Sequence, residues 1–222
     1  MQVFDPRWEF YAITDQASSR GRDDLAVAAA LLRGGATCLQ YRAKKVSARE
    51  QWETALGLRK LTLDAGVCFV VNDRVDLALD CGADGVHLGQ DDLPIASARR
   101  LARLAGRPEL VVGRSTHSLD QALEAEKDGA DYIGYGPLYA TQTKENNVPP
   151  VGPSSLGEIV DAMAIPVVAI GGIKLNRLLE VAAQRARHCA VVTALTGADD
   201  VEAAAREHLA AWRLATGSVA RR

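Results

Sequence analysis

The chain has 222 residues, of which 48% are hydrophobic and 24% are charged, and its formal net charge is −2. This balance is typical of a globular protein of one or two domains with a substantial core. The weak net charge excludes the basic composition of a nucleic-acid-binding protein, so we expect no nucleic-acid partner.

Membrane and secretory signals are absent from the sequence pattern. The longest uninterrupted apolar run, residues 25–32, is far shorter than the roughly 18 residues that a membrane-spanning helix needs. The cysteines, Cys38, Cys68, Cys81 and Cys189, form no Cys-x-x-Cys pair. We therefore expect buried, reduced thiols, no membrane association and a cytoplasmic location.

Short apolar runs recur along the chain, and polar residues follow each of them. The runs are continuously apolar rather than alternating, which is typical of parallel strands buried on both faces. They cover residues 10–13, 38–39, 68–71, 85–88, 110–113, 132–137, 166–170 and 189–192. Because polar residues always come after the run, they should gather at one end of a parallel sheet.

The segments between these runs show helical spacing. Apolar residues recur at i, i+3, i+4 and i+7 in several of them, and Ser or Asp precedes the first turn. We predict helices over residues 25–32, 47–63, 119–123, 175–182 and 201–214. Alternating strands and helices predict an α/β fold built from about eight βα units.

Eight βα units in this length fit a single (β/α)8 TIM barrel. The competing open sheet would carry a glycine-rich turn after its first strand, whereas Thr14 and Asp15 stand there. We predict one domain over residues 1–222, with a short extension about 1–9 and a tail about 216–222. Thr14 and Asp15 themselves have no role that the sequence indicates.

The second strand ends in a group of long polar side chains. Gln40, Arg42 and Lys44 are spaced i, i+2, i+4, so they share one face of an extended chain. Arg offers a planar fork and Lys a point charge, which suits an anionic ligand at a barrel mouth. Simple solvation of these charges at a strand end is an equal alternative.

Acidic residues follow the third and fourth strands. Asn72 and Asp73 end one run, and Asp91 and Asp92 follow the next. Two carboxylates completed by waters and substrate phosphates are a usual Mg²⁺ arrangement. N-capping of the following helices is the alternative, since Asp and Asn cap readily.

The last strands end in small and hydroxyl residues. Gly171 and Gly172 precede a helix, and Thr193 follows the eighth run. Phosphate sites recur at this place in barrels, although a tight turn alone would also need the glycines. His87 lies inside a strand and is interpreted as a hydrogen-bonded core residue, whereas His117 lies just past a strand end.

Five short motifs, in order along the chain, resemble those of the thiamine-phosphate synthase family. They are Gln40-x-Arg42-x-Lys44, Asn72-Asp73-Arg74-Val75-Asp76, Gly85-Val86-His87-Leu88-Gly89-Gln90-x-Asp92, Gly136-Pro137-x-x-x-Thr141-x-Thr143-Lys144 and Ala169-Ile170-Gly171-Gly172-Ile173. One departure is the turn Arg185-Ala186-Arg187-His188, which replaces the family's usual Gly-Ala-Asp-Gly. It precedes a strand, so we expect altered loop geometry and no loss of chemistry.

The resemblance implies the coupling of a hydroxymethylpyrimidine diphosphate to a thiazole phosphate (or its carboxylate), with release of pyrophosphate and with Mg²⁺ as cofactor. It assigns Arg42, Lys44, Ser115 and Lys144 to catalysis. For the pyrimidine diphosphate it implies Gln40, Tyr41, Arg42, Ala43, Lys44, Asn72, Ser115 and Lys144. For the thiazole phosphate it implies Thr141, Gln142, Thr143, Gly172, Val192 and Thr193. Asp73 and Asp92 are the implied Mg²⁺ ligands.

Two other functions stay open at this point. A related thiazole tautomerase shares the segment Gly113-Arg114-Ser115-Thr116-His117 as Gly-Arg-Ser-x-His, and His117 would then be its acid/base catalyst. A non-catalytic barrel that senses ligands is the remote alternative, and it would lack the metal carboxylates. The expected partners are small-molecule substrates, and the sequence also allows a homo-oligomer.

Overall fold

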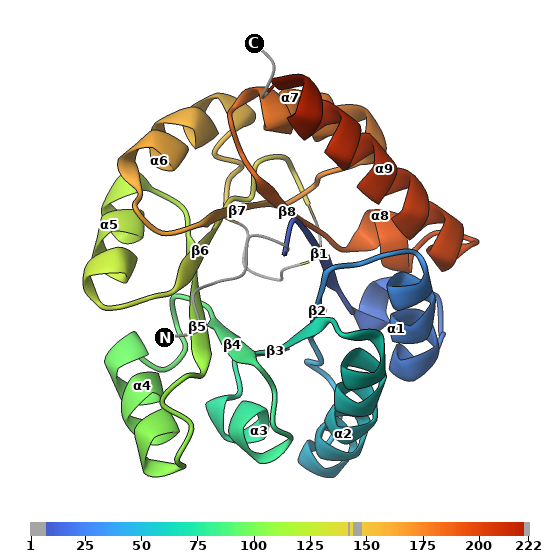
Figure 1. Ribbon diagram of the computed structural model, residues 1–222, viewed down its shortest axis with the longest axis vertical. Helices are drawn as coiled ribbons and strands as arrows, with labels where there is room; N and C mark the ends of the chain where they lie inside the picture. Colours follow the sequence, from blue (N-terminus) through green and yellow to red (C-terminus); the bar gives the residue numbers. More distant parts are fainter. Residues whose placement is uncertain (1–7, 142, 144–147, 220–222) are drawn as a thin grey trace.

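Eight parallel strands close into a barrel in the computed structural model, which describes residues 8–141, 143 and 148–219 (Figure 1). Neighbours in sequence are neighbours around the barrel, and β8 pairs with β1 to close it. The strands are β1 (Phe10–Ile13), β2 (Cys38–Tyr41), β3 (Cys68–Asn72), β4 (Gly85–Leu88), β5 (Val111–Thr116), β6 (Tyr132–Tyr135), β7 (Val167–Ile170) and β8 (His188–Val191). The predicted (β/α)8 architecture is confirmed.

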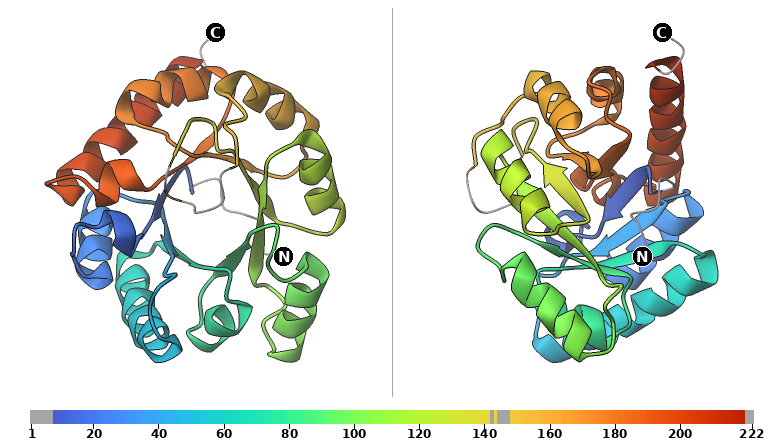
Figure 2. Two further views of the ribbon diagram at one scale, coloured as in Figure 1. Left: turned by 180° about the vertical axis from the view of Figure 1, so that it is seen from behind. Right: turned by 60° about the vertical axis from the view of Figure 1, so that its left-hand side comes forward.

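Helices surround the strands on the outside of the barrel, as Figures 1 and 2 show. They are α1 (Asp24–Arg33), α2 (Ala48–Ala65), α3 (Val75–Asp80), α4 (Ile95–Leu104), α5 (Leu119–Lys127), α6 (Leu156–Ala162), α7 (Leu178–Ala183), α8 (Thr193–Thr196) and α9 (Val201–Val219). Short 3-10 turns are η1 (Gln16–Ser18), η2 (Pro153–Ser155) and η3 (Leu175–Arg177). The last helix, α9, packs against α7 and α1 and completes the ring.

Side chains along each strand alternate between two cores. On β2, Leu39 and Tyr41 belong to the outer core between strands and helices, whereas Cys38 belongs to the core inside the barrel. Pairing of β1 with β2 sets Ile13 beside Gln40. The same alternation turns Gln40 and then Arg42 toward the barrel interior, where they line a pocket.

The first and last described segments of the chain, near residues 9 and 216, are joined to the barrel. Helix α9 continues to Val219, five residues beyond the predicted end of this helix at residue 214. Its last turns are held because Ala215 is buried and the Thr216 hydroxyl donates to the Trp212 carbonyl at 2.9 Å. At the other end, the Glu9 carbonyl accepts from the Cys189 N–H at 3.1 Å, so the barrel begins before residue 10.

All four cysteines are buried with free thiols, as the sequence predicted. Within residues 8–141, 143 and 148–219, no helix has the length and apolar content needed to cross a bilayer.

Candidate active site

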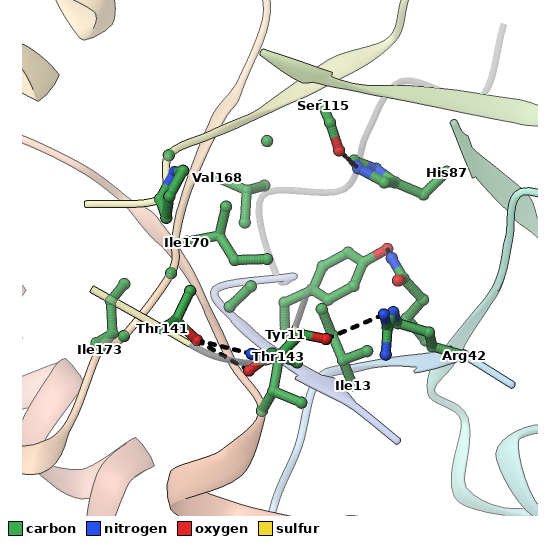
Figure 3. A pocket seen from close by; sticks show the side chains of 18 of the residues that line it. Tyr11, Ile13, Arg42, His87, Ser115, Thr141, Thr143, Val168, Ile170 and Ile173 are labelled. Atoms are coloured by element: carbon green, nitrogen blue, oxygen red, sulfur yellow. Dashed lines mark hydrogen bonds between the residues drawn. The ribbon is translucent and has the colours of Figure 1, made fainter. Parts of the chain in front are cut away.

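A pocket opens at the carboxyl ends of the strands and reaches into the barrel (Figure 3). Its inner wall combines buried aromatic and aliphatic side chains with a few hydroxyl, amide and cationic groups. Among its lining residues are Tyr11, Ile13, Gln40, Arg42, Asn72, His87, Ser115, Tyr132, Thr141, Thr143, Val168, Ile170, Gly172, Val192 and Thr193. A mostly apolar pocket with a few placed polar groups is typical of a small-molecule site.

A chain of hydrogen bonds crosses the floor of this pocket. The Ser115 hydroxyl contacts His87 Nε2 at 2.9 Å, and His87 Nδ1 contacts the Tyr132 hydroxyl at 3.0 Å. Tyr132 in turn contacts the Tyr11 hydroxyl at 2.8 Å, which accepts from Gln40 Nε2 at 3.0 Å. Burial raises the pKa of both tyrosines well above 10, so both hydroxyls stay protonated.

This floor refines the interpretation of His87. Both ring nitrogens are hydrogen-bonded inside the barrel, as expected of a core histidine. The ring also lines the pocket beside Ser115, which the strand pattern did not reveal. Tyr11 was missed for the same reason: an aromatic residue inside an apolar strand carries no sequence signal of a site. Its spacing of two residues from Ile13, which places both side chains on the same face of β1, was the available signal.

Arg42 projects into the pocket from the end of β2 (Figure 3). Its Nη1 binds the Asp15 carboxylate at 2.5 Å, and its Nη2 donates to the Thr143 carbonyl at 3.1 Å. Both charged side chains are nearly buried, with 11% exposed for Arg42 and 6% for Asp15. Arg42 is therefore held in place as part of the pocket wall. Its side chain is not simply exposed to water at a strand end, which was the alternative interpretation.

Lys44, Asp73 and Asp92 meet at a second corner, at the ends of β2, β3 and β4. The Lys44 ammonium forms an ion pair with Asp73, and the Asp73 and Asp92 side chains are hydrogen-bonded to each other. Asp92 also accepts from the Gly89 N–H at 2.6 Å. The predicted grouping of these residues is thus present, just beside the residues that line the pocket.

Neither carboxylate caps a helix, which was the alternative reading. The N-cap residues of α3 and α4 are Arg74 and Pro94, and neither makes a side-chain capping bond. Asp73 instead adopts a left-handed backbone conformation, with φ of 64°. Such a conformation is uncommon for a residue other than glycine, and it often marks a functional position.

The pKa values of the two carboxylates shift in opposite directions. Partial burial and the hydrogen bond with Asp92 raise the pKa of Asp73, although Lys44 opposes this. Partial burial also acts to raise the pKa of Asp92, but hydrogen bonds from Asp73 and the Gly89 N–H outweigh it and lower that pKa. Adjacent carboxylates cannot both ionise easily without a cation between them.

The β6–β8 side of the pocket carries hydroxyls and exposed backbone. The Thr141 and Thr143 hydroxyls contact each other at 2.9 Å, and Gly172, Val192 and Thr193 also line this side. Gly172 has φ of 64°, and a Cβ there would lie 2.8 Å from the Ala140 carbonyl oxygen. The glycine is therefore required by the turn as well as lying in the pocket wall.

Some predicted site residues are not brought to the pocket. The Tyr41 side chain is buried in the outer core, and Ala43 packs against the same core. Gln142 and Lys144 lie outside the described residues. His117 does line the pocket, where its Nδ1 is hydrogen-bonded to the Gly136 carbonyl.

Comparison with known proteins identifies the family of the chain. The family model for thiamine monophosphate synthase matches residues 10–195. The chain belongs to the thiamine monophosphate synthase family. The thiamine-phosphate synthase of Chloroflexus aurantiacus is 50% identical over 200 residues, 90% of each chain. That of Pyrococcus horikoshii is 45% identical over 201 residues, 90% of this chain and 93% of the relative.

Solved structures agree with this family assignment. A thiamine phosphate pyrophosphorylase from Pyrococcus furiosus superposes with a TM-score of 0.84 at 39% identity, covering 96% of this chain and 98% of the other. A 3-hexulose-6-phosphate synthase superposes with a TM-score of 0.68 at 18% identity, which shows a shared fold alone. The predicted thiamine monophosphate synthase family and its transferase class are confirmed.

Proposed function

We propose that this chain joins a hydroxymethylpyrimidine diphosphate to a thiazole phosphate and releases thiamine phosphate and pyrophosphate. The observation that carries the proposal is the division of one pocket into two polar sides. Arg42 lines the pocket at the end of β2, and Lys44, Asp73 and Asp92 lie just beside it. Hydroxyls and glycine backbone line the β6–β8 side, and an apolar wall lies between. Two anionic substrates could bind one at each polar side, with their reactive ends meeting at the apolar wall between them.

The pyrimidine diphosphate occupies the β2–β5 side in this proposal. Gln40 and Asn72 offer amide groups inside the pocket, and Ser115 offers a hydroxyl next to them. Arg42 and Lys44 hold the diphosphate, together with Lys144 from the β6–α6 loop. Tyr41 and Ala43 make no side-chain contact in this arrangement, because both pack toward the outer core.

Mg²⁺ fits the Asp73–Asp92 corner. Two neighbouring carboxylates repel each other when both are ionised, and a divalent cation between them would remove that repulsion. Among the described residues, no cluster of three or more His, Cys, Asp or Glu side chains could hold a metal. Asp73 and Asp92 would therefore hold Mg²⁺ with waters and diphosphate oxygens as the remaining ligands. Bound there, Mg²⁺ would supply positive charge to the diphosphate.

The site has the groups needed for a dissociative displacement. The amino-substituted pyrimidine stabilises a methylene cation, so the C–O bond to the diphosphate breaks before the new bond forms. Arg42, Lys44 and Lys144 stabilise the charge that develops on departing pyrophosphate. The thiazole nitrogen then attacks the methylene carbon and forms the C–N bond. No enzyme nucleophile takes part, and the apolar wall excludes water from the cation.

The thiazole phosphate occupies the β6–β8 side. Thr141, Thr143 and Thr193 offer hydroxyls, and the segment after β7 offers backbone N–H groups at Gly172. Val192 and Thr193 lie where the single turn of α8 begins, and both line this side of the pocket. Gln142 belongs to the same loop as the two threonines.

The direct test is a reaction of the purified protein with both substrates and Mg²⁺, followed by ³¹P NMR. We expect thiamine phosphate and pyrophosphate to appear in equal amounts, and chelation of Mg²⁺ to stop both. Absence of both products, with proton exchange on the thiazole phosphate carboxylate instead, would favour the tautomerase with His117 as catalyst. Ligand binding without either reaction would favour a sensing barrel.

A cytoplasmic location and a possible homo-oligomeric state remain parts of this proposal. The buried free thiols support a reducing compartment. Light scattering of the purified chain measures the oligomeric state.

A further inference from the structure

Asp15 lies at the end of β1, next to Arg42 at the end of β2. Its carboxylate contacts Arg42 Nη1 at 2.5 Å, and both side chains are nearly buried. The neighbouring Thr14 hydroxyl accepts from the Arg42 backbone N–H at 3.2 Å. The end of β1 therefore holds both the backbone and the guanidinium of Arg42.

Arg42 spans the pocket mouth from this anchor. Its Nη2 donates to the Thr143 carbonyl at 3.1 Å, as the dashed line in Figure 3 shows. Thr143 belongs to the loop whose threonine hydroxyls line the thiazole side of the pocket. One guanidinium thus connects the β1 end, through Asp15, to the β6–α6 loop.

Asp15 is itself fixed by the turn that follows it. Its carbonyl accepts from the Ser18 N–H at 3.0 Å and from the Ser19 hydroxyl at 2.8 Å. The Ser18 hydroxyl contacts the Thr196 hydroxyl in α8 at 2.6 Å. These contacts fix the backbone at Asp15, from which its side chain reaches Arg42.

A buried guanidinium without a partner is costly, so Arg42 would turn toward water if Asp15 were absent. With Asp15 in place, the guanidinium keeps one orientation before any substrate arrives. Its remaining N–H groups then need no rearrangement when an anion binds, which is the condition for effective electrostatic catalysis.

We propose that Asp15 is a positioning residue, which holds Arg42 in the orientation that binds the diphosphate and keeps the Thr143 loop at the pocket. Asp15 contacts neither substrate in this role. The proposal rests on the proposed function for the identity of the anion, but the Asp15–Arg42 relation can also be tested by anion binding alone.

The test combines Asp15→Ala, Asp15→Asn, Arg42→Ala and the double variant Asp15→Ala/Arg42→Ala. A displaced guanidinium can cost about 100-fold in rate, so we expect Asp15→Ala to lower kcat/KM for the diphosphate substrate about 10- to 100-fold. Asp15→Asn keeps an acceptor oxygen and should lose less. In the Arg42→Ala background, Asp15→Ala should cause no further loss.

Asp23→Ala is the matched control, because Asp23 is an exposed carboxylate near the same turn that caps α1 through the Ala26 N–H. It should leave kcat/KM unchanged. Independent, multiplying losses from Asp15→Ala and Arg42→Ala would overturn the positioning role. If Asp15→Ala does not fold, the isosteric Asp15→Asn carries the test, and its equality with the parent protein would also overturn the role.

Calorimetry with Mg²⁺-pyrophosphate separates this proposal from the proposed function. Weaker binding to Asp15→Ala than to Asp23→Ala, in a protein that makes no thiamine phosphate, would support the positioning role and refute the synthase. Synthesis of thiamine phosphate with unchanged pyrophosphate binding and kcat/KM in Asp15→Ala would support the synthase and refute the positioning role.

Discussion

The two ends of the barrel use aspartate in opposite ways. At the amino end, the Asp84 carboxylate accepts from the Phe69 N–H at 2.8 Å and from Arg59 of α2 at 2.8 Å and 3.1 Å. Asp131 repeats the arrangement with the Val112 N–H at 2.7 Å and Arg99 of α4 at 2.5 Å. These carboxylates are fully partnered, and they fasten strand starts to helices.

At the carboxyl end, the aspartates are partnered less uniformly, because Asp15 is paired with Arg42 and Asp73 with Lys44, whereas Asp24 is not paired among the described residues. Partial burial and the neighbouring Asp92 raise the pKa of Asp73. Asp24, at the start of α1, is buried with neither carboxylate oxygen hydrogen-bonded within the described part of the chain. Burial and the charge of Asp23 raise the pKa of Asp24 to about 6. The two amino-end carboxylates therefore stabilise the fold, whereas buried Asp24 costs stability and the partly exposed Asp73–Asp92 pair is the proposed place for a ligand.

The largest expected effect is on the activity of the carboxyl end. Asp73→Ala removes a proposed Mg²⁺ ligand and should lower kcat by about 10² to 10³, or about 2.7–4 kcal/mol, if it acts like a lost transition-state contact. Thermal unfolding should occur at the parent temperature or above. The exposed neighbour of the other carboxylate, Asp91, provides the control Asp91→Ala, which should keep full turnover. Parent-level pyrophosphate release by Asp73→Ala would contradict this division.

At the amino end, the same kind of substitution should affect stability instead. Asp84→Ala leaves the Phe69 N–H and the Arg59 guanidinium without their acceptor, which should cost about 1–3 kcal/mol. For a chain of this size, that lowers the unfolding midpoint by about 2–4 °C per kcal/mol. Urea unfolding measures the loss, and turnover per folded molecule should not change. A large fall in turnover would show that this end also supports catalysis.

Asp24 should respond to pH because its folded pKa, about 6, lies above the ordinary value of 3.8. Its contribution to stability is fully present below about pH 4 and is lost as pH rises through 6. Asp24→Asn should therefore stabilise the protein by about 1–2 kcal/mol near pH 7.5 and by little near pH 4.5. Urea unfolding at both values checks this. An equal increase in the free energy of unfolding at both pH values would mean that the ionisation of Asp24 does not cause the stabilisation.

The smallest effect concerns the turn before β8. Arg187 pairs with Val167 in the same relation as Asp84 with Phe69, given that His188 is in register with Val168. Arg187→Asp should place a carboxylate acceptor beside the Val167 N–H and stabilise the protein by about 0.5–1 kcal/mol. Arg187→Ala removes the same cation without adding an acceptor and should give no gain. Calorimetric unfolding of both variants checks this. Stabilisation by Arg187→Asp alone would indicate an added hydrogen bond, whereas equal stabilisation by both would indicate an effect of the lost charge.

The fold could be predicted from sequence because parallel strands leave a strong local signal. Continuous apolar runs gave β1, β3, β4 and β7 nearly to the residue. The six-residue α3 (Val75–Asp80) was not predicted individually because so short a helix shows no full period. The end of α9 was placed too early because Thr216 and Gly217 resemble a loop, although α9 extends past both.

The candidate site was predictable where alternation alone decides the direction of a side chain. Spacing i, i+2 placed Gln40 and Arg42 together inside the barrel. The partner of Arg42 was not predictable, because Asp15 lies 27 residues away and only barrel closure at β1 and β2 brings the two together. For Tyr41, the family motif implied a place at the substrate, whereas strand alternation turns its side chain into the outer core.

The most direct test of the contrast between the two ends measures kcat per folded molecule and the free energy of unfolding on the same preparations of Asp73→Asn and Asp84→Asn. Both substitutions remove one carboxylate charge and keep the side-chain shape. We predict that Asp73→Asn loses most of its turnover and none of its stability, whereas Asp84→Asn loses stability and keeps turnover. Equal losses of both quantities in the two variants would contradict a separation of chemistry and stability between the ends of the barrel.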